Sequence, residues 1–382
     1  MRVFSSLIDQ SEVMNVLQEA IKSAHNQGDQ TQGMTHAWLF TGPPGSGRSN
    51  AAIAFAAALV CKDGGCSNCV DCMATITNSH ADVELIKTEG LSIKIDEIRE
   101  LISRASWAPS VASWRVVVIK DADRLTDSAA NALLKVIEDP GLRTVWLLCA
   151  PTLTDVLPTI RSRCRHLSLH TPSVKAVAKL LIERDQISKE LAEFAARTSQ
   201  GHIGIAKHLA TNQQSRDNRL ATLKLPLTIK SIPTAYKAAE ILVNSAKAQA
   251  EADAEKRDES ELVNLKQGWG STGSKMASGG AKAIKELEKE QKTRGTRMVR
   301  DYLDRALLDL ATLYRDVLMV QSSSVENLIN QDMENEIIKI ASSTTESKTL
   351  LKIQAILRAR VNLSHSSATL LTVESLMLEL KD

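Results

Sequence analysis

The chain has 382 residues, enough for two or three domains, and 43% of them are hydrophobic, so a sizeable core can form. The 47 Lys and Arg nearly balance the 45 Asp and Glu, and only 3% of the residues are aromatic. This composition argues against a protein whose whole surface grips nucleic acid or stacks on single-stranded bases. Neither a signal-peptide pattern nor an apolar run near the roughly 18 residues of a membrane span is present, so we expect a soluble cytoplasmic protein.

Helical and strand patterns alternate over the first 168 residues. Helical spacing or composition is found at 7–23, 49–61, 94–106 and 128–139, and strand patterns at 36–40, 81–87, 114–123 and 144–150. Such alternation predicts an α/β domain with a doubly wound parallel sheet. The rest of the chain shows helical patterns only. We expect a small helical domain over 169–211 and an all-α domain over 212–382.

The strand predicted at 36–40 runs into "TGPPGSGRSN", a nearly complete phosphate-binding loop. Gly42, Gly47 and Ser49 match the template G-x-x-x-x-G-K-[ST], and Gly45 adds a further glycine. In such loops backbone N–H groups and a helix N-terminus hold phosphate, while the lysine reaches the β- and γ-phosphates. Arg48 stands in the lysine position, and a planar guanidinium is not an equivalent replacement. An ordinary strand-to-helix turn is the alternative.

The acidic end of the strand predicted at 114–123 is altered as well. Asp121 can serve Mg²⁺, as an Asp does in phosphate-loop ATPases, although capping a helix or turn is an alternative role. The next position, where many such enzymes carry a Glu that activates water, is Ala122. We expect the side chain of Asp123 to point elsewhere. The site is therefore predicted not to hydrolyse ATP, and it binds nucleotide weakly or not at all.

Four of the six cysteines crowd into twelve residues. Cys61, Cys66, Cys69 and Cys72 supply four thiolates, the full ligand set of a closed, tetrahedral structural zinc site. An iron–sulfur cluster is the alternative metal group, and four unrelated thiols the alternative without metal.

A basic segment, 156–169, follows the last predicted strand. Arg161, Arg163 and Arg165 occupy alternate positions around Cys164. Alternate arginines are typical of the solvated face of an edge strand. The order Ser-Arg-Cys directly after a nucleotide-type domain favours a functional role instead.

The phosphate loop, the Asp-Ala-Asp box, "LTDSAANALLKVIEDP" (125–140) and "TIRSRC" (159–164) together resemble the clamp-loader branch of the AAA+ ATPases. The cysteine insertion, 61–72, is similar to the zinc module of bacterial clamp-loader subunits. The resemblance implies an AAA+ domain over 1–168, a helical lid over 169–211 and a helical collar over 212–382, with a flexible insertion at 247–300.

Two kinds of bacterial clamp-loader subunit carry this module, an ATP-hydrolysing motor and a degraded relative. Besides Arg48 and Ala122, two positions depart from the motor pattern: Cys149 to Pro151 at sensor 1, and Gly204 at the sensor-2 arginine. The resemblance therefore implies a stator that does not hydrolyse ATP. An active motor of the gamma/tau type is the alternative, and a zinc-bearing adaptor outside clamp loading is a third possibility.

The resemblance also implies a role for Arg163 and a set of partners. The arginine of Ser-Arg-Cys reaches the γ-phosphate on a neighbouring subunit, as an arginine finger in trans. The partners implied are motor (gamma/tau) and delta subunits in a hetero-pentamer that loads the sliding clamp onto primed DNA for a replicative DNA polymerase, itself a nucleotidyltransferase. Zinc is the cofactor implied, and the chain would meet the nucleoid through the replisome.

Overall fold

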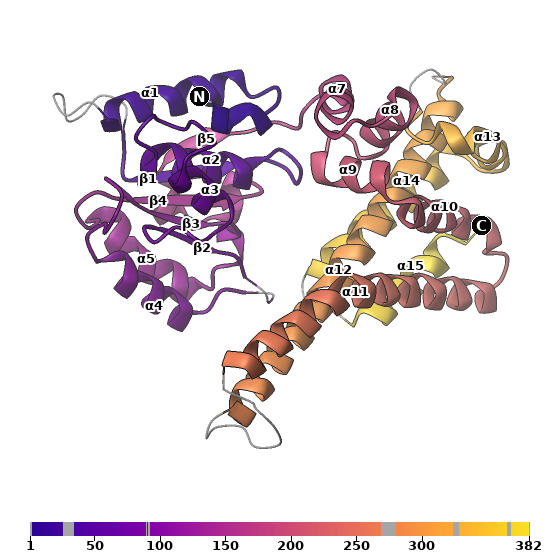
Figure 1. Ribbon diagram of the computed structural model, residues 1–382. Helices are drawn as coiled ribbons and strands as arrows, with labels where there is room; N and C mark the ends of the chain where they lie inside the picture. The colour runs from indigo at the N-terminus through magenta and orange to yellow at the C-terminus, as the bar shows by residue number, and fades with distance from the viewer. Residues whose placement is uncertain are drawn as a thin grey trace. The chain divides into compact units, whose positions relative to one another are not determined.

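A computed structural model describes residues 2–25, 34–88, 90, 92–268, 280–323, 328–364 and 368–381 (Figure 1). The chain divides into two compact units, Met1–Thr211 and Asn212–Asp382. The first unit contains a parallel sheet with helices on both sides and three further helices, and the second unit is helical. The prediction of an α/β domain followed by helical parts is thereby confirmed.

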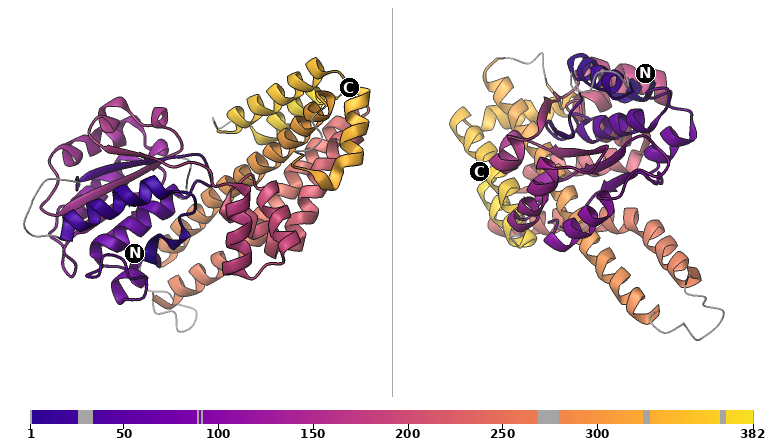
Figure 2. Two further views of the ribbon diagram at one scale, coloured as in Figure 1. Left: turned by 90° about the horizontal axis from the view of Figure 1, so that it is seen from above. Right: turned by 90° about the vertical axis from the view of Figure 1, so that its left-hand side faces the viewer.

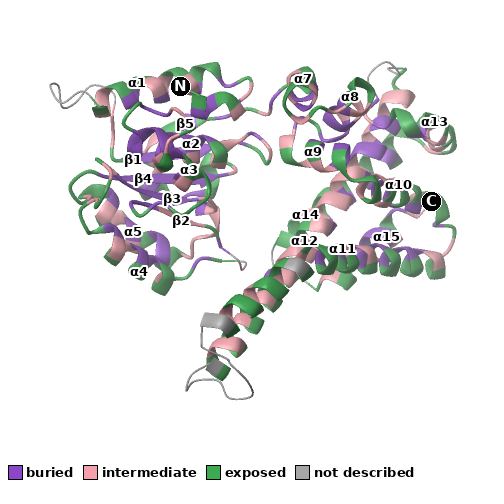
Figure 3. Ribbon diagram, in the orientation of Figure 1, coloured by how far each residue is buried: buried purple, intermediate pink, exposed green. Residues whose placement is uncertain are grey.

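The sheet has the strand order β2-β3-β4-β1-β5, and every pairing is parallel. Its strands are β1 (Ala37–Thr41), β2 (Val83–Ile86), β3 (Arg115–Ile119), β4 (Thr144–Ala150) and β5 (Arg165–Ser168). The three inner strands are buried along their whole length, as the apolar runs in the sequence predict (Figure 3). β3 ends at Ile119, four residues before the strand predicted there.

Alternate side chains of the inner strands point to opposite faces of the sheet. Trp38 and Phe40 pack on one face with α1 and α2, and Leu39 packs on the other with α4 and α5 (Figures 1 and 2). The helices and short helical turns that accompany the sheet are η1 (Arg2–Ser6), α1 (Ser11–His25), α2 (Arg48–Val60), α3 (Val70–Ile76), α4 (Ile95–Ala105), η2 (Ala122–Arg124), α5 (Asp127–Glu138), η3 (Leu153–Asp155) and α6 (Pro158–Arg161).

Three helices complete the first unit around a small core of their own. They are α7 (Val174–Asp185), α8 (Lys189–Thr198) and α9 (Ile203–Thr211), and Val177, Leu181 and Leu209 are among the side chains they bury. α7 starts where the hydroxyl of Ser173 accepts a hydrogen bond from the N–H of Ala176, an ordinary N-cap. These three helices, the lid helices, lie within the range 169–211, where the sequence predicts a small helical domain, and they belong to the first compact unit.

The second unit is built from α10 (Gln213–Thr228), α11 (Ile232–Gly268), α12 (Gly280–Gln321), η5 (Gln331–Met333), α13 (Glu334–Ser343), α14 (Glu346–Ser364) and α15 (Thr369–Glu379). The apolar stripe of α12 faces the interior of this unit. Leu303, Leu307, Leu310 and Tyr314 all lie in its main core. For this stripe, core packing rather than contact with another subunit is therefore the structural role.

α11 and α12 run side by side as a long hairpin (Figure 2). Its charged outer part holds the flanks of the segment 247–300, while the Gly/Ser-rich stretch 269–279 lies outside the described residues. Arg294 links the two helices through Asp258 and through Glu261, whose carboxylate lies 2.6 Å from the guanidinium. Both helices exceed the length of a membrane span, but among the described residues no helix is also apolar enough to cross one.

The carboxylate of Asp82 fixes the loop between α4 and β3. Its two oxygens accept hydrogen bonds from the N–H groups of Ser110, Val111 and Ala112, at 2.7 to 2.8 Å, and from the Ser110 hydroxyl. Burial alone would raise the pKa of Asp82, but these donors outweigh it and lower the pKa to about 2. The loop is therefore held by a carboxylate that must stay ionised.

We predict that Asp82→Asn destabilises the first unit by about 2 kcal/mol, because the new amide NH2 faces N–H donors that need an acceptor. Since the pKa is depressed, the stabilisation by Asp82 is complete above its ordinary value of about 3.9 and is lost as the pH falls toward about 2. Urea unfolding between pH 4.5 and 2 should therefore show a flatter pH dependence in the variant. Asp96→Asn, at an exposed position, is the control; equal slopes in both variants would contradict the assignment.

Candidate functional site

The phosphate-loop sequence forms a compact turn between β1 and α2. Gly45 and Gly47 adopt left-handed φ values of 90° and 86°, which favour glycine. A Cβ on Gly45 would lie 2.6 to 2.7 Å from atoms of His202, at the start of α9, so no larger residue fits there. The loop joins a strand to a helix, as its template requires, and His202 packs directly on it.

Arg48 is turned back onto its own loop. Its Nη1 donates a hydrogen bond of 2.8 Å to the carbonyl of Gly42, the first loop glycine. The N–H of Gly42 in turn donates to the carbonyl of Pro151, at 3.1 Å, and Ser46 N–H donates to Pro43. The guanidinium thus forms part of the loop wall, in contrast to a lysine that extends toward bound phosphate.

Several charged groups surround the buried thiol of Cys149 at the end of β4. Burial raises the pKa of this thiol to about 12, although Arg48 and Lys120 lie close enough to favour the thiolate. Burial also lowers the pKa of Lys120, with Lys87 adding to the effect. The structure therefore brings the loop, the sensor-1 position and the strand end at Asp121 together around one buried centre.

Asp123 lies beyond the end of β3, outside the strand that the sequence predicts for it. The residues after Ile119 leave the strand and form η2, so strand alternation no longer governs their direction. Burial raises the pKa of Asp123, and Asp121 and Arg48 both act on it electrostatically. Ala122 is buried and offers no base, and Gly204 in α9 offers no cation to a phosphate.

The four cysteines form a compact cluster at the end of α2. All four Sγ atoms lie within 4.8 Å of one another, and Cys61 Sγ is 3.7 Å from the Sγ atoms of Cys66 and Cys69. A tetrahedron with metal–sulfur bonds of about 2.3 Å has edges of about 3.8 Å, so one ion fits. An iron–sulfur cube would separate the thiolates further, because each binds a different iron. The donor set therefore fits a single metal ion.

Local structure holds these thiols together. Cys61 is the C-cap of α2 and Cys69 the N-cap of α3, and the Sγ atoms of Cys66 and Cys69 each accept a backbone N–H hydrogen bond of 3.3 Å. Hydrogen bonds from the backbone of Asn68 and Cys69 lower the pKa of Cys66 to about 7, which favours the ligating thiolate. His80, close in sequence, is a buried turn residue outside the metal-binding group.

Arg163 lies in the turn between α6 and β5, at the molecular surface. Its Nε and Nη2 contact Oε1 of Glu138 at 2.6 and 2.5 Å, and its Nη1 donates to the carbonyl of Thr159 at 2.8 Å. Its side chain is 39% exposed. The alternative that 156–169 is one edge strand is wrong at this residue, because β5 begins only at Arg165.

The turn of Arg163 and the phosphate loop lie at opposite ends of two neighbouring strands. β5 pairs in parallel with β1 in the register Trp38↔Arg165 to Thr41↔Ser168. The loop follows the carboxyl end of β1, whereas Arg163 precedes the amino end of β5. At about 3.3 Å per residue the two are separated by roughly 15 Å along the strands. Arg163 therefore cannot complete the loop of its own chain.

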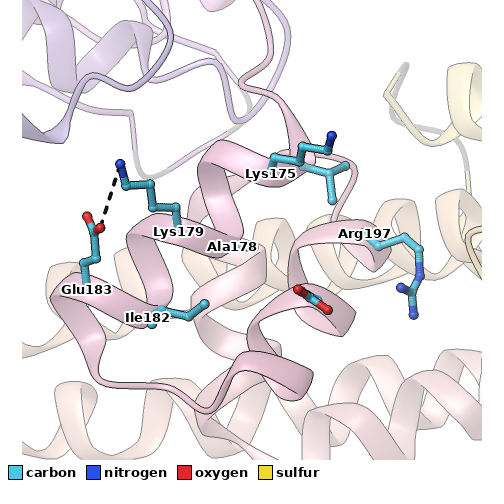
Figure 4. A pocket seen from close by; sticks show the side chains of 8 residues that line it. Lys175, Ala178, Lys179, Ile182, Glu183 and Arg197 are labelled. Atoms are coloured by element: carbon cyan, nitrogen blue, oxygen red, sulfur yellow. Dashed lines mark ion pairs between the residues drawn. The ribbon is translucent and has the colours of Figure 1, made fainter.

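The lid carries a surface pocket that the sequence did not indicate. It has a volume of about 530 Å³ between α7 and α8, with Ala178 and Ile182 at its floor and an ion pair of 3.8 Å between Lys179 and Glu183 at its rim (Figure 4). None of the predicted site residues lines it. The candidate site therefore remains the loop, the cysteine cluster and Arg163.

Comparisons with known proteins agree with this arrangement. A family model described as "DNA polymerase III, delta subunit" matches residues 10–173. The delta-prime subunit of DNA polymerase III from Bacillus subtilis is 27% identical over 97% of this chain and 98% of its own length. The delta-prime subunit from Pseudomonas aeruginosa is 31% identical over 42% of this chain and 52% of its own. The gamma/tau subunit from Mycobacterium tuberculosis is 33% identical, over only 35% of this chain and 24% of its own.

The chain is therefore similar to subunits of the DNA polymerase III clamp loader. The match to the Bacillus subtilis delta-prime subunit spans both chains almost completely, while the matches to gamma or tau subunits cover 35 to 56% of this chain.

We predict that removing the metal loosens the region around the cysteine cluster. Because a closed four-thiolate site contributes its binding free energy to folding, chelation or Cys66→Ser should lower the melting temperature of the first unit by several degrees. Metal analysis of the purified chain should give one equivalent of metal, lost on chelation. Cys164→Ser, at a cysteine outside the cluster, is the control. Unchanged melting after complete chelation would contradict a structural metal.

Proposed function

We propose that this chain is the non-hydrolysing stator subunit of a bacterial clamp loader, which lends Arg163 to ATP bound on a neighbouring subunit. The full-length similarity to a delta-prime subunit supports the stator role. The observation that best supports this proposal is the difference between two arginines of the chain, Arg163 and Arg48. Arg163 is partly exposed at the surface, whereas Arg48 of the chain's own phosphate loop is hydrogen-bonded to the carbonyl of Gly42.

The chain's own site lacks the chemistry of hydrolysis. Water needs a base, and Ala122 supplies none, while burial of Asp123 disfavours its carboxylate form. The cation at position 48 is bonded to Gly42 rather than directed at a phosphate. Gly204 has no side chain with which the lid could contact nucleotide. We therefore expect this subunit to work without ATP and Mg²⁺ in its own site. The loop would then serve only as a structural turn.

Arg163 has the properties of an arginine finger in trans. Its guanidinium is always charged and carries a planar donor fork that suits phosphate oxygens. It lies at the opposite end of the strands from its own loop, so a phosphate that it reaches must belong to another subunit. The expected neighbours are a motor (gamma/tau) subunit, and a delta subunit elsewhere in the pentamer. The complex would open the sliding clamp and close it around primed DNA in the cytoplasm, at the nucleoid.

Zinc is the metal that we propose for the cysteine cluster. Four thiolates at tetrahedral spacing are the usual zinc set, and they leave no open coordination position for a substrate. The metal would therefore brace the connection between α2 and α3 without taking part in phosphoryl transfer.

We predict that Arg163→Ala lowers ATP turnover of the assembled complex. At the site that this chain completes, loss of the finger should slow phosphoryl transfer about 10³-fold or more. The experiment is single-turnover ATP hydrolysis by the complex reconstituted with motor and delta subunits. Circular dichroism should show unchanged folding, because the ion pair of Arg163 is exposed and such pairs contribute little to stability.

Arg161→Ala is the matched control, since Arg161 is the neighbouring arginine in α6. If both variants support normal turnover, Arg163 is not the finger.

We also predict that Arg48→Lys leaves the isolated chain inactive. The substitution restores the loop template but neither the base at position 122 nor the missing contacts at Cys149 and Gly204, so two or more elements of hydrolysis stay absent. Steady-state phosphate release with ATP, Mg²⁺ and primed DNA is the measurement. Substantial turnover by the unmodified chain would instead establish the motor alternative.

A further inference from the structure

The contact between Arg163 and Glu138 follows from the topology of the sheet. In a parallel α/β arrangement the helices run back against the strands, so α5 ends at the sheet edge where β5 begins. Glu138 is the last residue of α5, and Arg163 lies just before β5. A single oxygen of Glu138 accepts from both Nε and Nη2 of Arg163.

The position of Glu138 is unfavourable for a carboxylate unless a cation lies nearby. The carboxyl end of a helix carries partial negative charge, and the C-cap residue Asp139 adds a second acid there. Arg163 supplies the compensating charge. The Glu138 side chain is 50% exposed, so solvent and other anions can reach the guanidinium beside it.

The donor fork of Arg163 is largely occupied within its own subunit. Glu138 takes Nε and Nη2, and Nη1 donates to Thr159 and, at 3.3 Å, to the Ser162 hydroxyl. A phosphate oxygen would need the same Nε and Nη2 donors for a paired contact. A phosphate bound in trans must therefore displace the carboxylate, at least in part.

We infer that Glu138 is a positioning residue for Arg163, which holds the guanidinium at the surface of this subunit until the phosphate of a nucleotide on the neighbouring subunit takes its place. This inference rests on the proposed function. Under this inference Glu138 competes with nucleotide for Arg163. The ion pair between Glu138 and Arg163 must break when ATP binds the guanidinium, so the ion pair lowers the apparent affinity for ATP at that site. Glu138 takes no part in the chemical step.

The test is ATP turnover by the reconstituted complex with Glu138→Gln, measured across ATP concentrations. Exposed ion pairs are worth up to about 1 kcal/mol, so KM should fall about two- to fivefold, with kcat within about twofold of the parent complex. Glu138→Ala should lower KM as well. This second variant is needed because a glutamine could keep part of the contact with Arg163, whereas an alanine cannot. Asp139→Asn removes the adjacent acid, which has no contact with Arg163 in the structure, and should leave KM unchanged.

Two results separate failure of this inference from failure of the proposed function. If Arg163→Ala lowers turnover but Glu138→Gln leaves KM unchanged, or lowers kcat at constant KM, the competition is refuted while the finger stands. If Arg163→Ala has no effect, both are refuted. The KM shift must also vanish when Glu138→Gln is combined with Arg163→Ala. A shift that persists in the double variant would show that Glu138 acts by another route.

Discussion

Close packing of α2 against the sheet positions both ends of that helix. Nine of its 13 residues are buried, and six of those nine are alanines, whose small side chains let the helix approach the strands and α1. The phosphate loop lies at its N-terminus and Cys61 at its C-cap, about 20 Å apart at 1.5 Å per residue. The buried helix α2 thus connects the loop to the metal-binding cluster. A change in the packing of α2 would therefore alter the position of both.

Contacts within the chain hold the phosphate loop. The Arg48 guanidinium bonds to the Gly42 carbonyl, and the Gly42 N–H bonds to Pro151. These interactions replace part of what a bound phosphate would contribute. Conservation of shape together with loss of catalytic groups is the physical basis for a subunit that serves as a scaffold.

Much of this architecture is predictable from the sequence, because buried parallel strands and C-x2-C spacing leave strong local patterns. The sequence places the three inner strands, the edge strand β2 and the cysteine group at nearly the right residues. β5 was not assigned, since four residues with charged and polar side chains at a sheet edge carry little apolar signal. Its neighbour α6 is a single turn.

Contacts between distant segments were harder to predict. The partner of Arg163 is 25 residues away in sequence, and its identity depends on where α5 ends relative to the sheet. Asp123 falls in η2 because β3 ends at Ile119 instead of running on to residue 123. The length of α11 and α12 is hard to predict from the sequence, because their outer turns contact one another through Arg294 and acidic residues and carry no apolar stripe there.

The phosphate loop and Arg163 lie at opposite ends of neighbouring strands, which gives the first unit a front and a back. Copies related by the same rotation meet front to back, so a row of them has a direction, and its two ends are not equivalent. A member whose loop has lost its chemistry can occupy the end where no finger arrives from a neighbour. In the proposed complex such a member would close the row on one side, and its Arg163 would face its neighbour.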